Sequence, residues 1–197
     1  MKVLGITGGI GSGKSTIAKE LVRFGIPVFV ADEESKKLLS GNEEIREKVK
    51  SLLGEQAYIA TEGTEIPNRK YIASKVFTDK QLLSELNSIM HPAVRQEFQT
   101  WKGVQQSSYV AYEAAILLET EGRKICDQIL LVTAPLEMRI ERVMARDQVN
   151  RQEVLQRMSK QSSEFDKLLL SDLVICNIKL TESTREVRFI NDFMLKY

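Results

Sequence analysis

Short apolar runs alternate with amphipathic segments along most of the chain. The runs are four or five residues long and rich in Val, Ile, Leu and Tyr, which is typical of buried strands. Because strands that alternate with helices form parallel sheets with both faces covered, the pattern predicts an α/β fold on a five-stranded parallel sheet flanked by helices. The expected strands are Val3–Ile6, Ile26–Val30, Tyr109–Tyr112, Ile129–Thr133 and Leu173–Cys176.

Helical periodicity fills most segments between these runs. Apolar side chains recur there every three or four positions, as in Val187, Ile190 and Met194. Pro135 suits the first turn of a helix because its missing N–H has no helical partner there. The expected helices are Lys14–Phe24, Glu33–Leu39, Glu43–Leu53, one from Pro135 to about Arg146, and one from Thr181 onward.

The rhythm changes between Gly54 and Lys102. Gly63 and Pro67 indicate a loop, and the step His91–Pro92 should interrupt or restart a helix because proline cannot donate a backbone hydrogen bond. The elements expected here are a loop at Thr61–Asn68 and helices at Arg69–Phe77 and Asp79–Met90.

A second change occurs at Asp147–Lys167, which is strongly polar and charged. The chain shows no internal repeat and no low-complexity segment, and the two departures are interpreted as helical excursions from one α/β core. We therefore interpret residues 1–197 as a single α/β domain, with a helical insertion at 54–102 and a helical lid at 147–167.

Composition and charge narrow the possible partners. The 197 residues carry 28 basic and 27 acidic side chains, a formal net charge of +1, so we expect no nucleic-acid partner. No apolar run approaches the roughly 18 residues of a membrane span, and the first residues lack the pattern of a secretory signal. We expect a cytoplasmic protein that binds no membrane and needs no obligate protein partner.

Cys126 and Cys176 lie far apart, each in an apolar run. This placement favours two buried free thiols over a disulfide or a metal site. With one histidine in the chain, a structural zinc site is not expected.

The first apolar run leads into a glycine-rich stretch, GITGGIGSGKST. Its residues Gly8, Gly13, Lys14 and Ser15 match G-x-x-x-x-G-K-[ST], the phosphate-binding loop between a strand and a helix. Glycines let the backbone approach a phosphate with its N–H groups turned inward, and the following helix adds the positive end of its dipole. We predict that the loop holds a nucleoside triphosphate, with Lys14 at the terminal phosphates and the Ser15 hydroxyl as a ligand of Mg²⁺.

Kinases, GTPases and motor ATPases share such a loop. A GTPase would also carry N-K-x-D and D-x-x-G, but no asparagine in this chain is followed by lysine and no aspartate is followed by glycine three positions on. The chain is also short for a motor. The sequence therefore argues against these two classes.

Acidic residues follow two of the expected strands. Asp32 comes after the second strand and Glu113 after the third. Ligands of open α/β sheets bind at the carboxyl ends of the strands. One carboxylate could orient or deprotonate an attacking hydroxyl, and the other could support Mg²⁺ directly or through a water molecule. The alternative is that each is a solvated loop charge.

A cluster of basic residues spans the second polar segment and the helix before it. Its members are Arg139, Arg142, Arg146, Arg151, Arg157 and Lys160. Such clusters are often solvated helix faces. Phosphoryl transfer, however, needs cations around the moving group and a site closed to water, and an arginine-bearing lid would supply both.

Several motifs together resemble the dephospho-CoA kinase family. In chain order they are GITGGIGSGKST, the aspartate after the second strand, His91–Pro92, the strand-end acid followed by ILLE, and Arg146–Asp147. The segment TEGTEIPNRKYIASKVF resembles the family's helical substrate domain, and SDLVICN, with Asn177, resembles its last strand. The resemblance covers about residues 1 to 180.

The resemblance implies a P-loop kinase fold and a reaction. In that reaction ATP, with Mg²⁺, phosphorylates the ribose 3′-hydroxyl of dephospho-CoA to give CoA and ADP, the last step of coenzyme A biosynthesis. Asp32 is then the candidate base, and Lys14 and Arg146 are the other catalytic groups. The remaining expected roles are ATP binding by Gly11, Ser12, Gly13, Lys14, Ser15, Thr16, Arg142 and, on the adenine side, Asn177; substrate binding by Asp32, His91 and Glu113; and metal binding by Ser15 and Glu113. For His91 a helix-breaking or capping role is an alternative.

Three positions depart from the family pattern. The family commonly has Asp-Ala-Asp after the second strand, where this chain has Val30, Ala31 and Asp32. The loss of the first acid argues against a mechanism with a shared pair of carboxylates. The family commonly has aspartate and proline where this chain has Glu113 and Ala115, which leaves the geometry around Mg²⁺ and the acceptor open.

Two other functions remain open from the residues alone. One is a different P-loop kinase of nucleotides or small metabolites, which a panel of acceptors would distinguish. The other is a nucleotide-dependent binding protein, which should hydrolyse ATP slowly and show no turnover that depends on an acceptor.

Overall fold

The computed structural model describes residues 1–61 and 63–196; residue 62, which falls in the loop expected at Thr61–Asn68, and residue 197 lie outside the described part. The chain forms two compact units. The first consists of Met1–Val30 and the chain from Gln105 onward, and the second is Ala31–Val104.

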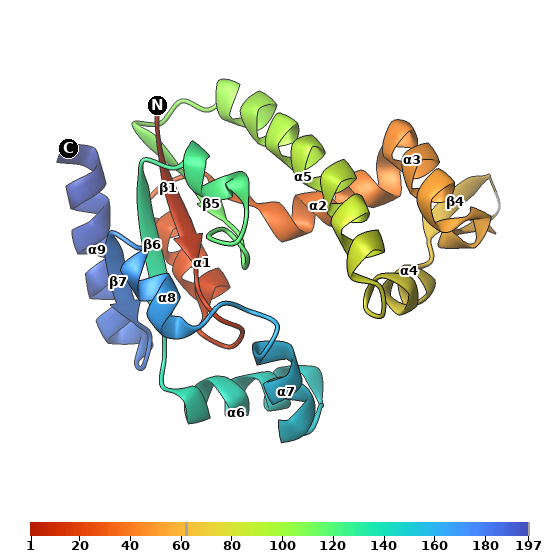
Figure 1. Ribbon diagram of the computed structural model, residues 1–197. Helices are drawn as coiled ribbons and strands as arrows, with labels where there is room; N and C mark the ends of the chain where they lie inside the picture. The colour runs from red at the N-terminus through yellow and green to blue at the C-terminus, as the bar shows by residue number, and fades with distance from the viewer. Residues whose placement is uncertain (62, 197) are drawn as a thin grey trace. The chain divides into compact units, whose positions relative to one another are not determined.

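The first unit is built on a parallel sheet of five strands, as expected (Figure 1). Its strands are β1 (Lys2–Thr7), β2 (Val28–Val30), β5 (Tyr109–Glu113), β6 (Gln128–Thr133) and β7 (Leu173–Cys176). Their order in the sheet is β2-β5-β1-β6-β7, so β1 has a neighbour on each side and β2 and β7 are the edges. The last residue of β1 therefore lies at the middle of the carboxyl edge of the sheet.

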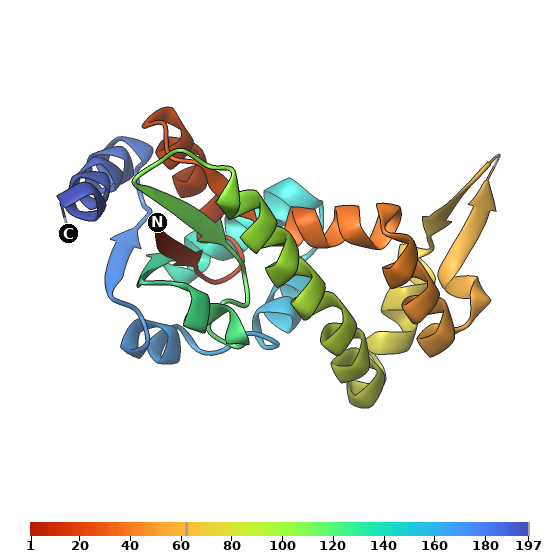
Figure 2. The ribbon, with the colours of Figure 1, turned by 90° about the horizontal axis from the view of Figure 1, so that it is seen from above.

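Helices cover both faces of this sheet. Figure 2 shows α1 and α9 on one face and α8 and the short 3-10 helix η2 on the other. On the face covered by α1 and α9, Leu4 and Ile6 of β1 share a buried cluster with Leu21 and Ile190. The helices are α1 (Lys14–Arg23), η2 (Glu121–Ile125), α6 (Leu136–Asp147), α7 (Arg151–Met158), α8 (Glu164–Leu169) and α9 (Leu180–Lys196). The lid expected at 147–167 thus spans α7 and the start of α8.

The cysteines differ in burial. Cys126 is buried, and burial raises the pKa of its thiol to about 12. Cys176 is exposed, so the expectation of two buried thiols is wrong for this residue. It ends the edge strand β7, where the alternate residue Ile175 is the one that faces the core.

The second unit is mainly helical. Its helices are α2 (Ala31–Gly41), α3 (Glu43–Leu53), the 3-10 helix η1 (Glu55–Ala57), α4 (Arg69–Val76) and α5 (Lys80–Gly103). The helices α2, α3 and α4 all contact α5. Ile45, Val49, Ile72 and Met90 belong to the buried cluster that they form. The insertion expected at 54–102 lies inside this unit, and its role stays a prediction.

A hairpin replaces part of the expected loop at Thr61–Asn68. β3 (Tyr58–Thr61) and β4 (Thr64–Pro67) pair antiparallel, with Ile59 opposite Ile66. The expected loop is wrong here because glycine and proline also fit a tight turn and a strand end. Gly63 instead has the positive φ of 82° that tight turns favour, and Pro67 is the last residue of its strand, where a missing N–H costs little.

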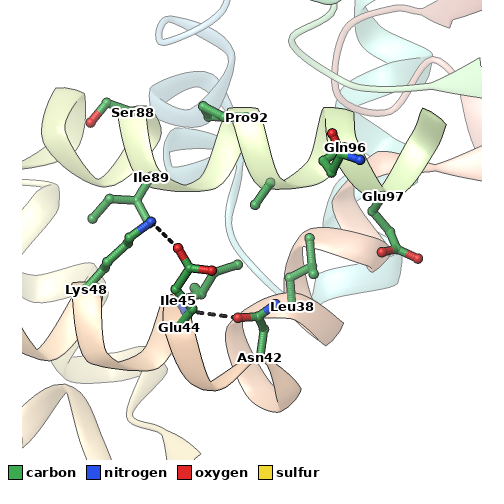
Figure 3. Close-up of a pocket in the computed structure, with 11 residues that line it drawn as sticks. Leu38, Asn42, Glu44, Ile45, Lys48, Ser88, Ile89, Pro92, Gln96 and Glu97 are labelled. Atoms are coloured by element: carbon green, nitrogen blue, oxygen red, sulfur yellow. Dashed lines mark hydrogen bonds and ion pairs between the residues drawn. The ribbon is translucent and has the colours of Figure 1, made fainter. Parts of the chain in front are cut away.

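The long helix α5 contains Pro92 without interruption, so the break expected at His91–Pro92 is also wrong. Proline leaves the carbonyl four residues earlier, at Ser88, without its helical donor. Ser88 and Pro92 are both exposed and both line a cavity of about 630 Å³ between α5 and the α2–α3 region (Figure 3). The packing of α5 against α2, α3 and α4 keeps the helix continuous across this position.

Candidate active site

The glycine-rich loop connects β1 to α1 at the middle of the sheet. A hydrogen bond from the Ser12 N–H to the Gly9 carbonyl (3.1 Å) closes its first turn. Gly13 precedes α1 with a positive φ of 92°, a conformation that other residues rarely adopt. The Lys14 ammonium donates to the Gly8 carbonyl at 3.0 Å, so the side chain folds back over the loop.

The loop presents donors for an anion. Among the described residues, no acceptor bonds to the backbone N–H groups of Gly11, Gly13 and Ser15. The first N–H groups of a helix have no partner within the helix, and they carry the positive end of its dipole. This arrangement matches the requirement for a phosphate site.

Asn177 supports the loop from beneath. It directly follows β7, its Nδ2 donates to the Ser12 carbonyl (2.9 Å), and its Oδ1 accepts from the Ser183 hydroxyl (3.0 Å). A Cβ at Gly13 would overlap the Asn177 carboxamide, which explains the glycine. Asn177 is only 5% exposed. The structure thus brings this residue to the loop, while its expected contact with adenine stays a prediction.

Arg142 lies beside Asn177. One of its terminal nitrogens donates to the Asn177 carbonyl at 3.0 Å. The other, Nη1, is buried and has no hydrogen-bond partner in the described part of the chain. A buried donor without a partner is costly, and the expected contact of Arg142 with ATP stays a prediction.

Glu113 ends β5 at the carboxyl edge of the sheet. In the register of the sheet it pairs with Ile6 of β1 and with Val30 of β2, so it lies one position before the level of Thr7, the last residue of β1. Its side chain is buried, with 4% exposure. Glu113 therefore lies at the carboxyl edge, next to the strand that leads into the loop, and its roles in binding Mg²⁺ and substrate stay predictions.

Asp32 belongs to the second unit. It is exposed and lies in the first turn of α2, two residues beyond the end of β2 along the chain. Its role as a base stays a prediction.

Arg146 lies at the end of α6 with 65% of its side chain exposed. It makes two hydrogen bonds to Asp147, at 2.7 and 3.1 Å, and Arg157 adds a third at 2.7 Å. These bonds, those from Arg146 first, hold the pKa of Asp147 below its usual range. Within the described residues no contact links the Arg146 side chain to the loop, so its catalytic role stays a prediction.

His91 is half-buried in α5 of the second unit, immediately before Pro92. Burial, and after it the positive charge of Arg95, lower the pKa of its imidazole. The side chain is therefore neutral at pH 7, and it can position an acceptor by hydrogen bonding but not by charge.

The lowered pKa of His91 predicts a pH effect on stability. The unfolded chain takes up the proton more readily than the folded one, so stability is lost as the pH falls below about 6.5. We expect the melting temperature of the wild type to drop more between about pH 7.5 and about pH 5.5 than that of His91→Gln. Equal drops in the two proteins would contradict this assignment.

Arg139 and Gln161 both bind the loop, a role the sequence does not predict for either. Arg139 is expected only as a member of the basic cluster, as a solvated helix charge or a lid cation, and Gln161 has no expected role. The Arg139 Nε donates to the Ile10 carbonyl (3.0 Å), and the Ile10 N–H donates to the Gln161 side chain (2.9 Å). The first contact joins two residues that are 129 positions apart in the sequence, and the second joins two that are 151 positions apart. No local pattern in the sequence could have revealed them.

A nucleotide-bound metal fits this donor set. In the described part of the chain, no three His, Cys, Asp or Glu side chains gather into a protein-only metal site. Mg²⁺ in kinases needs few protein ligands because phosphates and water supply the rest. The Ser15 hydroxyl, exposed at the start of α1, and the Glu113 carboxylate are oxygen donors of the right kind.

None of the helices in the described residues combines the length and hydrophobicity that a membrane-spanning helix requires.

Comparison with known proteins agrees with this geometry. A model of the dephospho-CoA kinase family matches residues 2–182. The curated dephospho-CoA kinase of Bacteroides fragilis (strain YCH46) is 36% identical over 175 residues, which cover 88% of this chain and 83% of that protein. The expected resemblance is therefore confirmed.

Solved structures support the same fold. A crystal structure of a Thermus thermophilus protein is 32% identical, has a TM-score of 0.85, and the match covers 99% of this chain and 97% of that one. The structure of a dephospho-CoA kinase from Campylobacter jejuni matches with a TM-score of 0.70 at 22% identity, over 100% and 98% of the two chains. The sheet order, the loop after β1 and these matches lead to one conclusion. The chain belongs to the dephospho-CoA kinase family.

Proposed function

We propose that this protein transfers the γ-phosphoryl group of ATP to the ribose 3′-hydroxyl of dephospho-CoA, which gives CoA and ADP. The observation that supports this most directly is the family match over residues 2–182. The unpaired N–H groups of the loop agree with the use of a nucleoside triphosphate.

The loop binds and orients the donor in this proposal. The N–H groups of Gly11, Gly13 and Ser15 hold phosphate oxygens, and the dipole of α1 favours their negative charge. Lys14 leaves the Gly8 carbonyl and places its ammonium on the terminal phosphates. Because these groups are positioned before the reaction, they stabilise the charge on the transferring group without reorganisation.

Asp32 acts on the acceptor. The support for this role comes from the sequence: Asp32 is the second residue after β2, and ligands of such sheets bind at the carboxyl ends of the strands. We assign to it the orientation of the 3′-hydroxyl and the acceptance of its proton, which adds typically 10²–10⁴-fold. His91 serves as a neutral group on the acceptor side.

Mg²⁺ would be held by the Ser15 hydroxyl and by Glu113, directly or through water. When bound it neutralises charge on the phosphate oxygens. Glu113 has one methylene more than the aspartate common at this position. Its carboxylate therefore reaches further, so the water bridge to Mg²⁺ can be shorter than aspartate would need.

Mass spectrometry of dephospho-CoA incubated with ATP, Mg²⁺ and the protein tests the proposal. We expect a product heavier by one phosphoryl group, formed in step with ADP. A parallel panel with nucleoside monophosphates and shikimate tests the other kinases. Phosphorylation of another acceptor alone, or ATP hydrolysis that no acceptor accelerates, would reject the proposed reaction.

Arg146→Lys is expected to lower kcat by roughly tenfold or more, with a smaller change in ATP affinity. The guanidinium is planar and can hold two phosphate oxygens together, whereas lysine keeps the charge and loses the fork. Steady-state kinetics with ATP varied, together with a direct ATP titration, measure both quantities. Arg185→Lys, an exposed arginine on α9, is the control. Weaker ATP binding at constant kcat would indicate stacking on adenine instead, and no change would remove both roles.

A further inference from the structure

Arg139 is a buried cation against the phosphate loop. Only 8% of the residue is exposed, although it is an arginine in the first turns of α6. Its Nε donates to the Ile10 carbonyl at 3.0 Å, and its Nη1 pairs with Glu164 at 2.6 Å. A Cβ at Gly9 would overlap the guanidinium, and a Cβ at Gly11 would overlap the Arg139 backbone carbonyl. The glycines therefore make room for Arg139 as well as for a phosphate.

The loop segment that Arg139 touches is a β-turn. The Ser12 N–H bonds to the Gly9 carbonyl, and Gly11, the third residue of the turn, has a positive φ of 80°. This combination is typical of a type II turn. In that type the central peptide, between Ile10 and Gly11, is rotated by about 180° relative to a type I turn.

The orientation of this peptide decides where the Gly11 N–H points. A trans peptide directs its C=O and N–H to opposite sides. Because Arg139 binds the Ile10 carbonyl, the Gly11 N–H points away from α6. It is one of the loop N–H groups that no acceptor bonds to in the described residues.

Residues 161–164, which lead into α8, make the remaining contacts with this turn and with Arg139. Gln161 accepts from the Ile10 N–H at 2.9 Å, so both sides of Ile10 are held. Glu164 pairs with Arg139 through Oε2, while its Oε1 is buried without a partner among the described residues. The Glu164 side chain is 38% exposed, and its pair with Arg139 links the turn to the 161–164 segment.

We propose that Arg139 is a positioning residue that holds the Ile10–Gly11 peptide in the orientation that presents the Gly11 N–H to a nucleotide phosphate. Through Glu164 and Gln161, this orientation depends on the 161–164 segment. The inference rests on ATP being the nucleotide of the proposed function. It assigns Arg139 no contact with the substrate.

Direct titration of the protein with ATP and Mg²⁺ tests the inference without any acceptor. Arg139→Met cannot donate to Ile10, and we expect its Kd for ATP to rise about tenfold, the effect of one lost hydrogen bond to a charged group. Glu164→Gln keeps the size of the side chain and weakens the pair, so we expect about a threefold rise. Arg185→Met, on the exposed side of α9, should leave the Kd unchanged.

A second readout separates positioning from a purely structural role. The ¹⁵N–¹H resonance of Gly11 should shift in both Arg139→Met and Glu164→Gln before ATP is added, and Arg139→Lys, which keeps one donor, should restore part of the affinity. If the variants melt at a lower temperature but bind ATP like the wild type with an unchanged Gly11 resonance, the inference is wrong. If Arg139→Met does not fold, Glu164→Gln and Arg139→Lys decide by the same two measurements.

The outcome is independent of the acceptor. A wild-type protein that binds ATP but does not phosphorylate dephospho-CoA would reject the proposed reaction and leave the Arg139 comparison intact. A fully active wild type with unaffected variants would reject only the role of Arg139.

Discussion

Lys14→Ala is expected to reduce phosphoryl transfer by at least about 10²–10³-fold, the typical cost of removing one preorganised group that stabilises transition-state charge. The variant should still fold. The hydrogen bond that the Lys14 ammonium donates to the Gly8 carbonyl contributes about 1.5–3 kcal/mol, which is less than the roughly 5–15 kcal/mol of a typical domain. Alanine also suits the start of a helix interior at least as well as lysine. Steady-state assays with dephospho-CoA and ATP measure the loss, and the melting temperature checks the fold.

Lys19→Ala is the matched control for this variant. Lys19 is an exposed lysine on the same helix, and its replacement removes the same charge from α1 without touching the loop. We expect its activity to equal that of the wild type. If Lys14→Ala turned over nearly as fast as Lys19→Ala, the loop would not bind the transferred phosphate in the way proposed.

Asp32→Asn is expected to lower kcat by roughly 10²–10⁴-fold while ATP binds almost normally. Asparagine keeps the shape of the side chain and its ability to accept a hydrogen bond, but it cannot take the proton of the acceptor hydroxyl. Asp32 is also one of three acids in the first turn of α2, where a negative charge stabilises the helix by no more than about 1 kcal/mol. A direct ATP titration and kcat with dephospho-CoA measure the two quantities.

Glu33→Gln controls for the loss of charge at this helix end. It is the next residue of the same turn and is exposed, so it matches Asp32 in charge and in position along the chain. A kcat in Asp32→Asn equal to that in Glu33→Gln would mean that Asp32 is only a helix-terminal charge. Glu113→Gln would then be the variant to examine for the base.

Most of the fold follows from the spacing of apolar residues. The bounds of α3 and β7 are those expected, and the remaining expected strands lie within one or two residues of the observed ones. Such segments are predictable because one buried strand or one amphipathic helix creates its pattern locally. Pro92 shows the limit. Its local preference to end a helix is overridden by the packing of α5 against α2, α3 and α4, which no window of sequence contains.

The candidate site likewise contains residues that local sequence predicts and contacts that only the packing of distant elements creates. The phosphate loop is recognisable because its function needs a fixed order of glycines and a lysine within eight positions, from Gly8 to Ser15. Glu113 at the edge of the sheet follows from its place after a strand. The contacts of Arg139 and Gln161 with Ile10 depend on how distant elements pack, and neither residue type nor spacing marks them. Arg146 lies on α6, as expected. The structure adds that its guanidinium already donates two hydrogen bonds to the Asp147 carboxylate.

The hydrogen bond from Asn177 to the loop has a consequence for the nascent chain during translation. The glycine-rich stretch is synthesised before Asn177, which follows Ser12 by 165 positions. At about 5–20 residues per second, translation separates them by roughly 10–30 s. During that time the Ser12 carbonyl lacks the carboxamide that donates to it, and β7 has not joined the sheet. The loop therefore gains its full set of contacts only after the first unit has been synthesised through Asn177.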